Sequence, residues 1–203
     1  MTNTTAPETA PQLAVAGARP GSRRRAVAIL ALLSVLVLAF AGWQVTVRTY
    51  ELEPGYFGIR SPDAVEHVAG DVREYRYPMV PGTSHRISIS MRNPGPLPVR
   101  VTGFGGDPQE WPQSMFPITA IEVNRDVDGN LAAGDPFVPF TLAAQEAVLV
   151  HLTVRVDKQT GDGCMRVWWG FLPVHYTVLG VDREQQFTLD PVIAFEGGTD
   201  CAD

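Results

Sequence analysis

The sequence lacks the short motifs by which common enzyme classes are recognised. It contains no G-x-S-x-G nucleophile turn, no H-E-x-x-H metal site and no glycine-rich phosphate-binding loop. Its two cysteines are not in a C-x-x-C arrangement, and no lipobox cysteine follows the long apolar stretch described below. These absences favour a protein that is not an enzyme, that uses no cofactor and that is not a lipoprotein.

Basic residues are also scarce over most of the chain. Of the 16 basic and 22 acidic residues, four arginines and one glutamate precede residue 26, which leaves 12 basic and 21 acidic residues after it. Phosphate recognition depends on clustered Lys and Arg, so this excess of acid disfavours both nucleic acid and anionic lipid as ligands of the outer part. We therefore predict no nucleic-acid binding.

The chain does contain one long apolar stretch. Residues 26–47 are uncharged, and as a helix they span about 33 Å, enough to cross a hydrocarbon core of about 30 Å. Several arginines precede the stretch and only Arg48 follows it closely, which keeps the N-terminus in the cytoplasm. We predict a transmembrane helix in the cytoplasmic membrane, with the lipid bilayer as its partner and the C-terminal domain outside. The residues that set this topology are Arg23, Arg24, Arg25 and Trp43, the last at the headgroup level that Trp prefers.

A cleaved signal peptide is the alternative interpretation of the same stretch. Residues 26–38 form an apolar core of signal-peptide length, and Ala39-Phe40-Ala41 provides a cleavage site of small residues. However, the apolar character continues to Val47, and the segment before the core is long for a signal peptide. We favour a retained anchor over secretion after cleavage near Ala41.

Composition divides the chain into four segments. Residues 1–25 are rich in Thr, Ala, Pro and Gly and cannot bury enough apolar surface to fold, so we expect a disordered basic cytoplasmic tail. The transmembrane helix covers 26–47, and residues 48–70 form a juxtamembrane connector. Within it, the apolar run 55–60 predicts either a first strand or a loop packed under the domain, and 62–68 predicts one helical turn. Residues 71–203 form one extracytoplasmic domain.

Alternation of apolar and polar residues dominates this outer domain. Over residues 86–92, Ile and Met alternate with Ser and Arg, and residues 147–156 keep Val and Leu on one face. A period of two favours half-buried strands, and such stretches recur about every ten residues with Gly, Pro, Asn and Asp between them. The pattern predicts an all-β fold, an immunoglobulin-like antiparallel β-sandwich of about seven to nine strands after one N-terminal transmembrane helix.

Three stretches resemble a known class of proteins. They are RISISMRNPGPLPVR at 86–100, the strand pattern of 141–156 and VHYTVLGVDREQQFTL at 174–189. Together they resemble the single-pass, immunoglobulin-like membrane proteins of high-GC Gram-positive (actinobacterial) bacteria. That class is similar in an Asn-x-Gly strand end, matched at 93–95, and in a final Tyr-x-Val-Leu-Gly hairpin, matched at 176–180. The resemblance implies fold and location and no catalytic residue.

Both cysteines lie in the part of the chain predicted to be outside the cell membrane. Thiols there are usually oxidised, so we predict a disulfide between Cys164 and Cys201. By the chain-entropy estimate such a bridge contributes about 3 to 4 kcal/mol, and it would fasten the C-terminal tail to the domain. A redox-active or metal-binding pair is disfavoured by the spacing.

The nearest approach to a metal site is a polar loop. Asp126, Asp128 and Asn130 place oxygen atoms at alternate positions around Gly129, as a calcium loop does, and Asp135 is the only acid available to complete it. Asp-Gly sequences also make ordinary strand connections. We favour a plain turn and treat calcium as a weak candidate.

The four histidines, His67, His85, His151 and His175, are isolated from one another in the sequence. His151 and His175 both lie opposite the aliphatic face of a predicted strand. On one sheet surface they could bind a metal together with nearby acids, but we favour solvent-facing strand residues.

Tryptophans are the strongest candidates for an interaction surface. Trp168 and Trp169 are adjacent on a predicted strand, so they point to opposite faces and at most one is expected in the core. The exposed one and Trp111, from a loop rich in Gly and Pro, form a candidate patch for a protein or a cell-wall sugar. Packing alone is the alternative.

These observations predict a membrane-anchored extracytoplasmic binding or scaffolding module, an accessory part of a membrane or envelope complex. Its expected partners are the bilayer, through residues 26–47, and a protein of unknown identity. The alternative is a cell-envelope glycan-binding domain.

Overall fold

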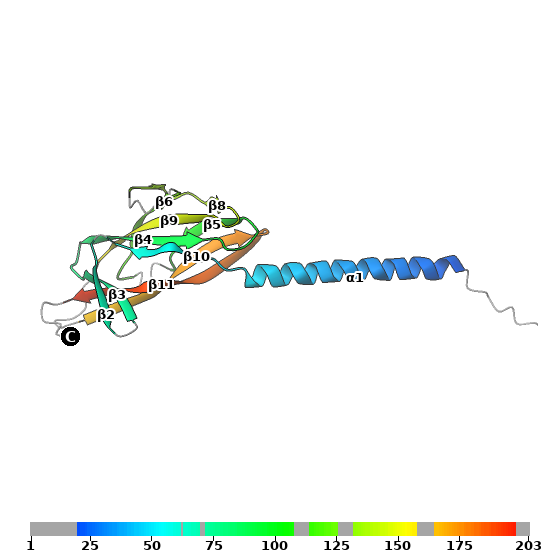
Figure 1. Cartoon of the computed structure of the whole chain (residues 1–203), viewed down its shortest axis with the longest axis horizontal. Helices are drawn as coiled ribbons and strands as arrows, with labels where there is room; N and C mark the ends of the chain where they lie inside the picture. Colours follow the sequence, from blue (N-terminus) through cyan, green and yellow to red (C-terminus); the bar gives the residue numbers. More distant parts are fainter. Residues whose placement is uncertain are drawn as a thin grey trace, which may run out of the picture. The chain divides into compact units, whose positions relative to one another are not determined.

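The computed structural model describes residues 20–61, 63–69, 72–107, 114–125, 132–157 and 165–197. It divides the chain into two units, Met1–Thr46 and Val47–Asp203. Figure 1 draws the helix of the first unit and the strands of the second.

Helix α1 (Pro20–Thr49) contains the whole predicted membrane stretch. Its large apolar side chains from Val27 to Phe40 are exposed, with Leu38 71% accessible, so this part of the helix buries none of its apolar surface within its own chain, whereas Val47 near the end of the helix is buried. The hydroxyls of Ser34 and Thr46 each donate to the carbonyl four residues earlier, at 2.9 Å, and are thus satisfied inside the helix. From Arg24 to Thr49 the helix is long and apolar enough to cross a membrane.

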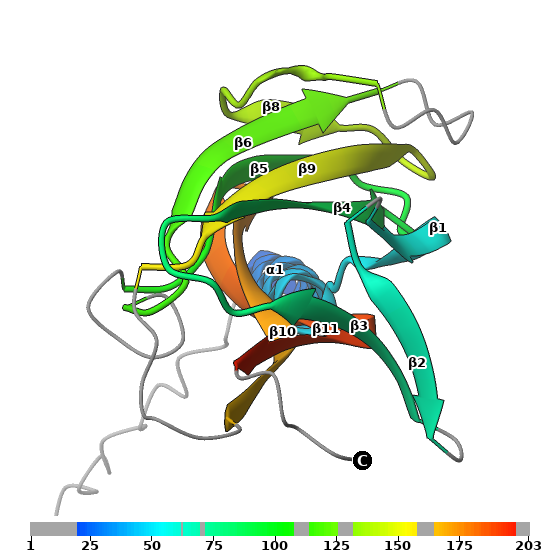
Figure 2. The ribbon, with the colours of Figure 1, turned by 90° about the vertical axis from the view of Figure 1, so that its left-hand side faces the viewer.

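Within the described ranges, the second unit contains eleven strands in two facing sheets (Figure 2). Sheet A has the order β1-β4-β9-β6-β7 and sheet B the order β2-β3-β11-β10-β5-β8. Sheet A comprises β1 (Glu53–Arg60), β4 (Ser84–Arg92), β6 (Ile118–Asn124), β7 (Asp135–Pro136) and β9 (Ala147–Arg155). Sheet B comprises β2 (Val65–Ala69), β3 (Val72–Pro78), β5 (Val99–Phe104), β8 (Phe140–Leu142), β10 (Met165–Val178) and β11 (Val181–Gly197). All neighbours are antiparallel except β3 and β11, which are parallel.

This fold confirms the predicted immunoglobulin-like β-sandwich after an N-terminal helix, but the estimate of seven to nine strands was too low. Two of the additional strands, β1 and β2, lie within residues 48–70, and β2 occupies most of the segment expected as a helical turn. The sequence signal of β1 is weak because Pro54 pairs with Met91 while Ile59 pairs with Ile89, so a bulge interrupts its alternation. The second unit already begins at Val47.

The core lies between the sheets and is built from the alternate apolar residues of the sequence. Ile87, Ile89 and Met91 of β4 are at most 3% exposed. In sheet B, the ring of Phe195 stacks on Phe116, with centroids 4.1 Å apart. The other fully buried side chains of the long strands include Val148, Val150, Leu152, Val154, Val167, Trp169, Leu172, Val174, Tyr176 and Val178.

Sheet B changes register in its two longest strands. Trp169 of β10 pairs with Ile193 of β11, but Phe171 already pairs with Thr188, so β11 has extra residues at this point. Such an irregularity bends a sheet and increases its twist. Before this point, the β11 residues opposite β10 also pair with β3. After it, β10 pairs with β5 on its other side, with Val178 opposite Val99.

The first residues of the second unit are built into one end of the sandwich. The Tyr50 hydroxyl lies 2.8 Å from Asn93 Oδ1 and accepts a hydrogen bond from the Leu97 backbone N–H at 3.1 Å. The Tyr176 hydroxyl donates to the Tyr50 carbonyl at 2.6 Å, and Arg183 Nη1 donates to the Val47 carbonyl at 2.9 Å. Because Tyr50 and Asn93 are at most 8% exposed, these bonds are protected from water.

Candidate functional site

An exposed tryptophan lies on the outer face of sheet B. Trp168 alternates with the buried Val167 and Trp169, so its side chain points away from the core and is 50% exposed. Its indole Nε1 donates to Glu74 Oε1 of β3 at 3.0 Å. Across β11, Trp168 is opposite Ala194, which in turn is opposite Arg76 of β3. The hydrogen bond therefore holds a large apolar ring on the surface in one orientation.

Two charge pairs surround this indole. Arg76 Nε donates to Glu74 Oε2 at 3.2 Å, and Arg166 Nη2 donates to Glu196 Oε1 at 2.8 Å. The four charged side chains are only 12% to 23% exposed, so these pairs are less screened than ordinary surface ion pairs. We define the Trp168 platform as Glu74, Arg76, Arg166, Trp168 and Glu196.

Neighbouring positive charges and hydrogen bonds keep Glu74 of the platform ionised. Burial by itself raises the pKa of Glu74, but the hydrogen bonds from Trp168 and Arg76, with the positive charges of Arg76 and Arg166, outweigh it and lower the pKa. A Glu74 carboxylate accepts the indole N–H more strongly than a neutral carboxyl would. Trp168 therefore presents a fixed apolar face beside alternating charges, which suits stacking and hydrogen bonding with a ligand rather than proton transfer.

Exposed aliphatic side chains extend the platform. Val65 of β2 is opposite Arg76 and is 71% exposed. Val72 shares the outward register of Glu74 along β3 and is 51% exposed. Together with Trp168 they form an apolar surface interrupted by paired charges, a composition typical of interaction surfaces.

The three tryptophans of the predicted patch have different outcomes in the structure. Trp169 is 2% exposed and belongs to the core, where its indole Nε1 has no hydrogen-bond partner among the described residues. Trp168 is the exposed member of the adjacent pair. Trp111 lies outside the described residues, so the candidate patch is represented by Trp168 and its neighbours.

A polar pair that the sequence did not indicate lies on the outer face of sheet A. Ser88 of β4 is opposite His151 of β9, and Ser88 Oγ lies 2.7 Å from His151 Nδ1. Both residues are 1% exposed, so His151 is not the solvent-facing residue that the alternation favoured. Because nothing from solvent reaches either group, the pair is a buried polar contact rather than a nucleophile with its base.

Two other side chains close over His151. Arg86 Nη2 donates to Glu122 Oε2 at 2.9 Å and to the Ala132 carbonyl at 3.3 Å. Burial, followed by the positive charge of Arg86, holds the pKa of His151 below its ordinary value, although Glu122 and the Ala132 carbonyl act in the opposite direction. The imidazole is therefore neutral in the folded protein near neutral pH.

His175 lies on the other sheet, so it does not share a surface with His151. Its Nε2 is 2.9 Å from the Gly105 carbonyl, and its Nδ1 is 3.8 Å from Glu184 Oε2. Among the described residues, no group of three or more His, Cys, Asp or Glu side chains could hold a metal ion.

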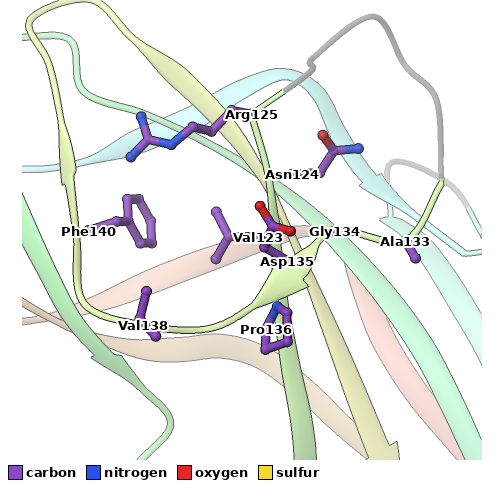
Figure 3. A pocket seen from close by; sticks show the side chains of 9 residues that line it. All are labelled: Val123, Asn124, Arg125, Ala133, Gly134, Asp135, Pro136, Val138 and Phe140. Atoms are coloured by element: carbon purple, nitrogen blue, oxygen red, sulfur yellow. The ribbon is translucent and has the colours of Figure 1, made fainter.

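A cleft of about 440 Å³ lies between the end of β6 and the segment that contains β7 (Figure 3). Arg125 and Phe140 stand at one side of it in Figure 3, and the guanidinium lies 5.6 Å from the ring centroid. Arg125 Nη1 also donates to Glu146 Oε1 at 2.7 Å, so its charge is compensated. Asp135, the acid considered for the calcium loop, lines this cleft. We assign it no ligand.

The remaining predicted site residues lie outside the described residues. These are the cysteines of the predicted disulfide, Cys164 and Cys201, and the calcium candidates Asp126, Asp128 and Asn130.

Of the topology residues, Arg24 and Arg25 are exposed on α1, and the Trp43 ring contacts Phe40 with centroids 5.5 Å apart.

No family model matches this chain, and no curated protein matches it either. Among solved structures, it is similar to the Vibrio cholerae VesB protease, with 11% identity and a TM-score of 0.34 over 79% of this chain and 35% of that one. It is also similar to a family 123 glycoside hydrolase from Clostridium perfringens, with 10% identity and a TM-score of 0.37 over 73% and 27%. A third similarity is to the ASH / PapD-like domain 7 of human CEP192, with 14% identity and a TM-score of 0.29 over 70% and 89%.

The chain thus spans about a third of the protease and about a quarter of the glycoside hydrolase. Similarities this weak give no guide to the activity or partners of this chain.

Proposed function

We propose that this protein is a membrane-anchored binding module whose sandwich lies outside the cytoplasmic membrane and offers the Trp168 platform to a protein partner. One observation carries the proposal. Trp168 is half exposed yet held by a hydrogen bond to an ionised acid, and an ordered aromatic ring at a surface loses little entropy on binding. In this role the protein acts as an accessory subunit of a membrane or envelope complex.

Two features support the membrane part of the proposal. Helix α1 is apolar and long enough to span a bilayer, and its most apolar part is not buried by the rest of the chain. The arginines before residue 26 outnumber Arg48 after it, which favours an inside N-terminus. The intact mass of the protein purified from its own membrane tests retention, because cleavage near Ala41 would remove the tail and most of the helix.

The binding role is tested by site-specific crosslinking in intact cells. A photoreactive phenylalanine analogue is placed at Trp168 in one variant and at Tyr56 in a matched control, since Tyr56 is 76% exposed and lies on sheet A. We expect a discrete adduct with one protein from position 168 and none from position 56. Equal adducts from both positions, or none from position 168, would contradict the proposal.

The same platform supports a second candidate, a binder of cell-envelope glycan. An exposed indole flanked by carboxylates and guanidinium groups can stack on a sugar ring and hydrogen-bond its hydroxyls, and Glu74 and Arg166 are positioned to do so. Titration of the purified full chain with soluble cell-wall fragments tests this candidate. Heat of binding that disappears in Trp168→Ala but persists in Tyr56→Ala would favour the glycan over the protein partner.

A further inference from the structure

Three loops meet at the end of the sandwich where Tyr50 is bound. They are residues 93–98 between β4 and β5, 143–146 between β8 and β9, and 179–180 between β10 and β11. We call them the Tyr50 loops. Their strands are neighbours, because Val178 is opposite Val99 and Val99 is opposite Leu142. The three connections therefore emerge side by side from one end of sheet B.

Hydrogen bonds hold two of these loops to each other and to Tyr50. Asn93 Nδ2 donates to the carbonyls of Leu97 at 2.7 Å and Ala143 at 2.9 Å. Gln145 Nε2 donates to the Pro94 carbonyl. A Cβ at residue 95 would overlap the Tyr50 ring, so glycine is required for this close approach. The loops form one ordered surface.

Of the twelve residues in the Tyr50 loops, Glu146 alone carries a charge, and its carboxylate accepts a hydrogen bond from Arg125 Nη1 at 2.7 Å. Their sequences are Asn-Pro-Gly-Pro-Leu-Pro, Ala-Ala-Gln-Glu and Leu-Gly, and most of these residues are exposed. The opposite end of β9 does carry exposed charges, those of Arg155 and Asp157. An exposed surface whose single charge is ion-paired is unusual at the end of a domain with this many acidic residues.

The turn at Leu179 adds a second, independent observation. Leu179 and Gly180 both have positive φ, at 49° and 79°, as in the tight two-residue turns that favour Asn-Gly or Asp-Gly. A leucine in this backbone region costs about 1 kcal/mol relative to residues that tolerate it. It places an apolar side chain, 47% exposed, at the tip of the hairpin.

We propose that the Tyr50 loops rest on the outer surface of the lipid bilayer, with Leu179 and the 93–98 loop at the boundary between headgroups and acyl chains. The inference rests on the proposed membrane anchor, since the helix ends at Thr49 and Tyr50 is already bound in this end of the sandwich. Chain connectivity alone therefore keeps these loops within a few residues of the membrane. Apolar and uncharged side chains are the ones that this boundary accepts without a desolvation penalty.

Lipid contact would give the sandwich a second attachment besides the covalent one. Position 168 lies ten residues before position 178 along β10, roughly 30 Å at the usual rise per residue of a strand. The contact would restrict tilting of the sandwich against the bilayer and hold the Trp168 platform clear of the headgroups.

Quenching of single fluorescent labels by brominated lipid tests the inference. The full chain, with both cysteines changed to serine, receives one new cysteine as Leu179→Cys, as Val80→Cys or as Ala41→Cys, each labelled with the same environment-sensitive dye. Val80 is 51% exposed in the β3–β4 connection, at the other end of β4 from Asn93. Ala41 lies within the apolar stretch of α1. Each variant is reconstituted in phosphatidylcholine vesicles with and without bromine on the acyl chains.

We expect strong quenching at positions 41 and 179 and at least threefold weaker quenching at 80. Quenching at 41 with equal, weak quenching at 179 and 80 would overturn the lipid contact and leave the anchor intact. Absence of quenching at 41 would overturn both the anchor and the contact. If the cysteine-free chain does not fold, Leu179→Trp and Val80→Trp in the unmodified chain give the same comparison as excess quenching over the native tryptophans.

Discussion

The outward positions of sheet A and sheet B come from the same alternation of strand residues, yet the two faces differ. On sheet A, Ser88 and His151 point outward and are each 1% exposed, because Arg86, Glu122 and Ala132 close over them. On sheet B, Trp168 points outward and remains half exposed. An outward position in a strand thus specifies which sheet face a side chain is on, while its exposure depends on what distant segments cover it. The open face is the one available to a partner.

The largest expected effect separates the two adjacent tryptophans. Trp169→Ala should lower the free energy of unfolding by about 4 kcal/mol, because it leaves a large cavity in the core. Trp168→Ala should cost less than about 1 kcal/mol, since the ring is half exposed. Denaturant unfolding of the full chain in detergent, followed by far-ultraviolet circular dichroism, measures both. Similar losses in the two variants would mean that the Trp168 face is covered.

The next largest effect concerns the outer face of sheet A, where Ser88 and His151 are covered. Ser88→Ala removes the partner of the buried His151 Nδ1 and should cost about 2 kcal/mol, the usual penalty for leaving a buried polar group unsatisfied. Ser84→Ala, on the same strand but exposed, is the matched control and should change stability by less than about 0.5 kcal/mol. The same unfolding experiment applies. A Ser88 loss no larger than that of the control would show that water reaches His151.

The closed face also predicts a dependence on pH. Burial holds the pKa of His151 below its ordinary value, so the unfolded chain binds this proton more readily than the folded protein does. The contribution to stability is fully present above the ordinary histidine pKa of about 6.5 and is lost as pH falls through it toward the folded value. Stability should therefore decrease from pH 8 to pH 5. His151→Gln should flatten this decrease, and His175→Gln, at a half-exposed site, should retain it.

The smallest expected effect concerns the fixed orientation of the Trp168 ring on the outer face of sheet B. Glu74→Ala removes the acceptor of the Trp168 indole N–H and should change stability by no more than about 1 kcal/mol. It should nevertheless shift the indole N–H resonance of Trp168 and speed its exchange with solvent. Glu184→Ala, an exposed acid on β11, provides the control and should leave that resonance unchanged. An unaltered Trp168 resonance in Glu74→Ala would show that the hydrogen bond does not order the ring.

Much of the architecture follows from local patterns in the chain. The alternation at 86–92 and 147–156 predicted β4 and β9, and their inward residues are buried. Strand β1 was harder to predict because its bulge breaks the alternation, and β2 because its five residues gain their structure by pairing with β3. Short strands of this kind depend on partners that no local pattern specifies.

The candidate site was likewise predicted only in part. Adjacent positions predicted that Trp168 and Trp169 would point to opposite faces, but did not indicate which of them would be in the core. Glu74 and Trp168 are 94 residues apart in the chain, and they meet only because β3 pairs with β11 in parallel and β11 pairs with β10. No motif in the sequence links them.

The sequence by itself determined the apolar helix, the β-sandwich class and the inward residues of its long strands, because these depend on hydrophobic runs and a period of two within a single segment. Only the tertiary structure decided that Ser88 and His151 are covered, that Trp168 stays open beside Glu74 and that three loops with a single ion-paired charge gather around Tyr50. The physical reason is that burial, strand register and hydrogen-bond pairing are formed between segments far apart in the chain. Local patterns fix the direction of a side chain, whereas long-range packing fixes its neighbours.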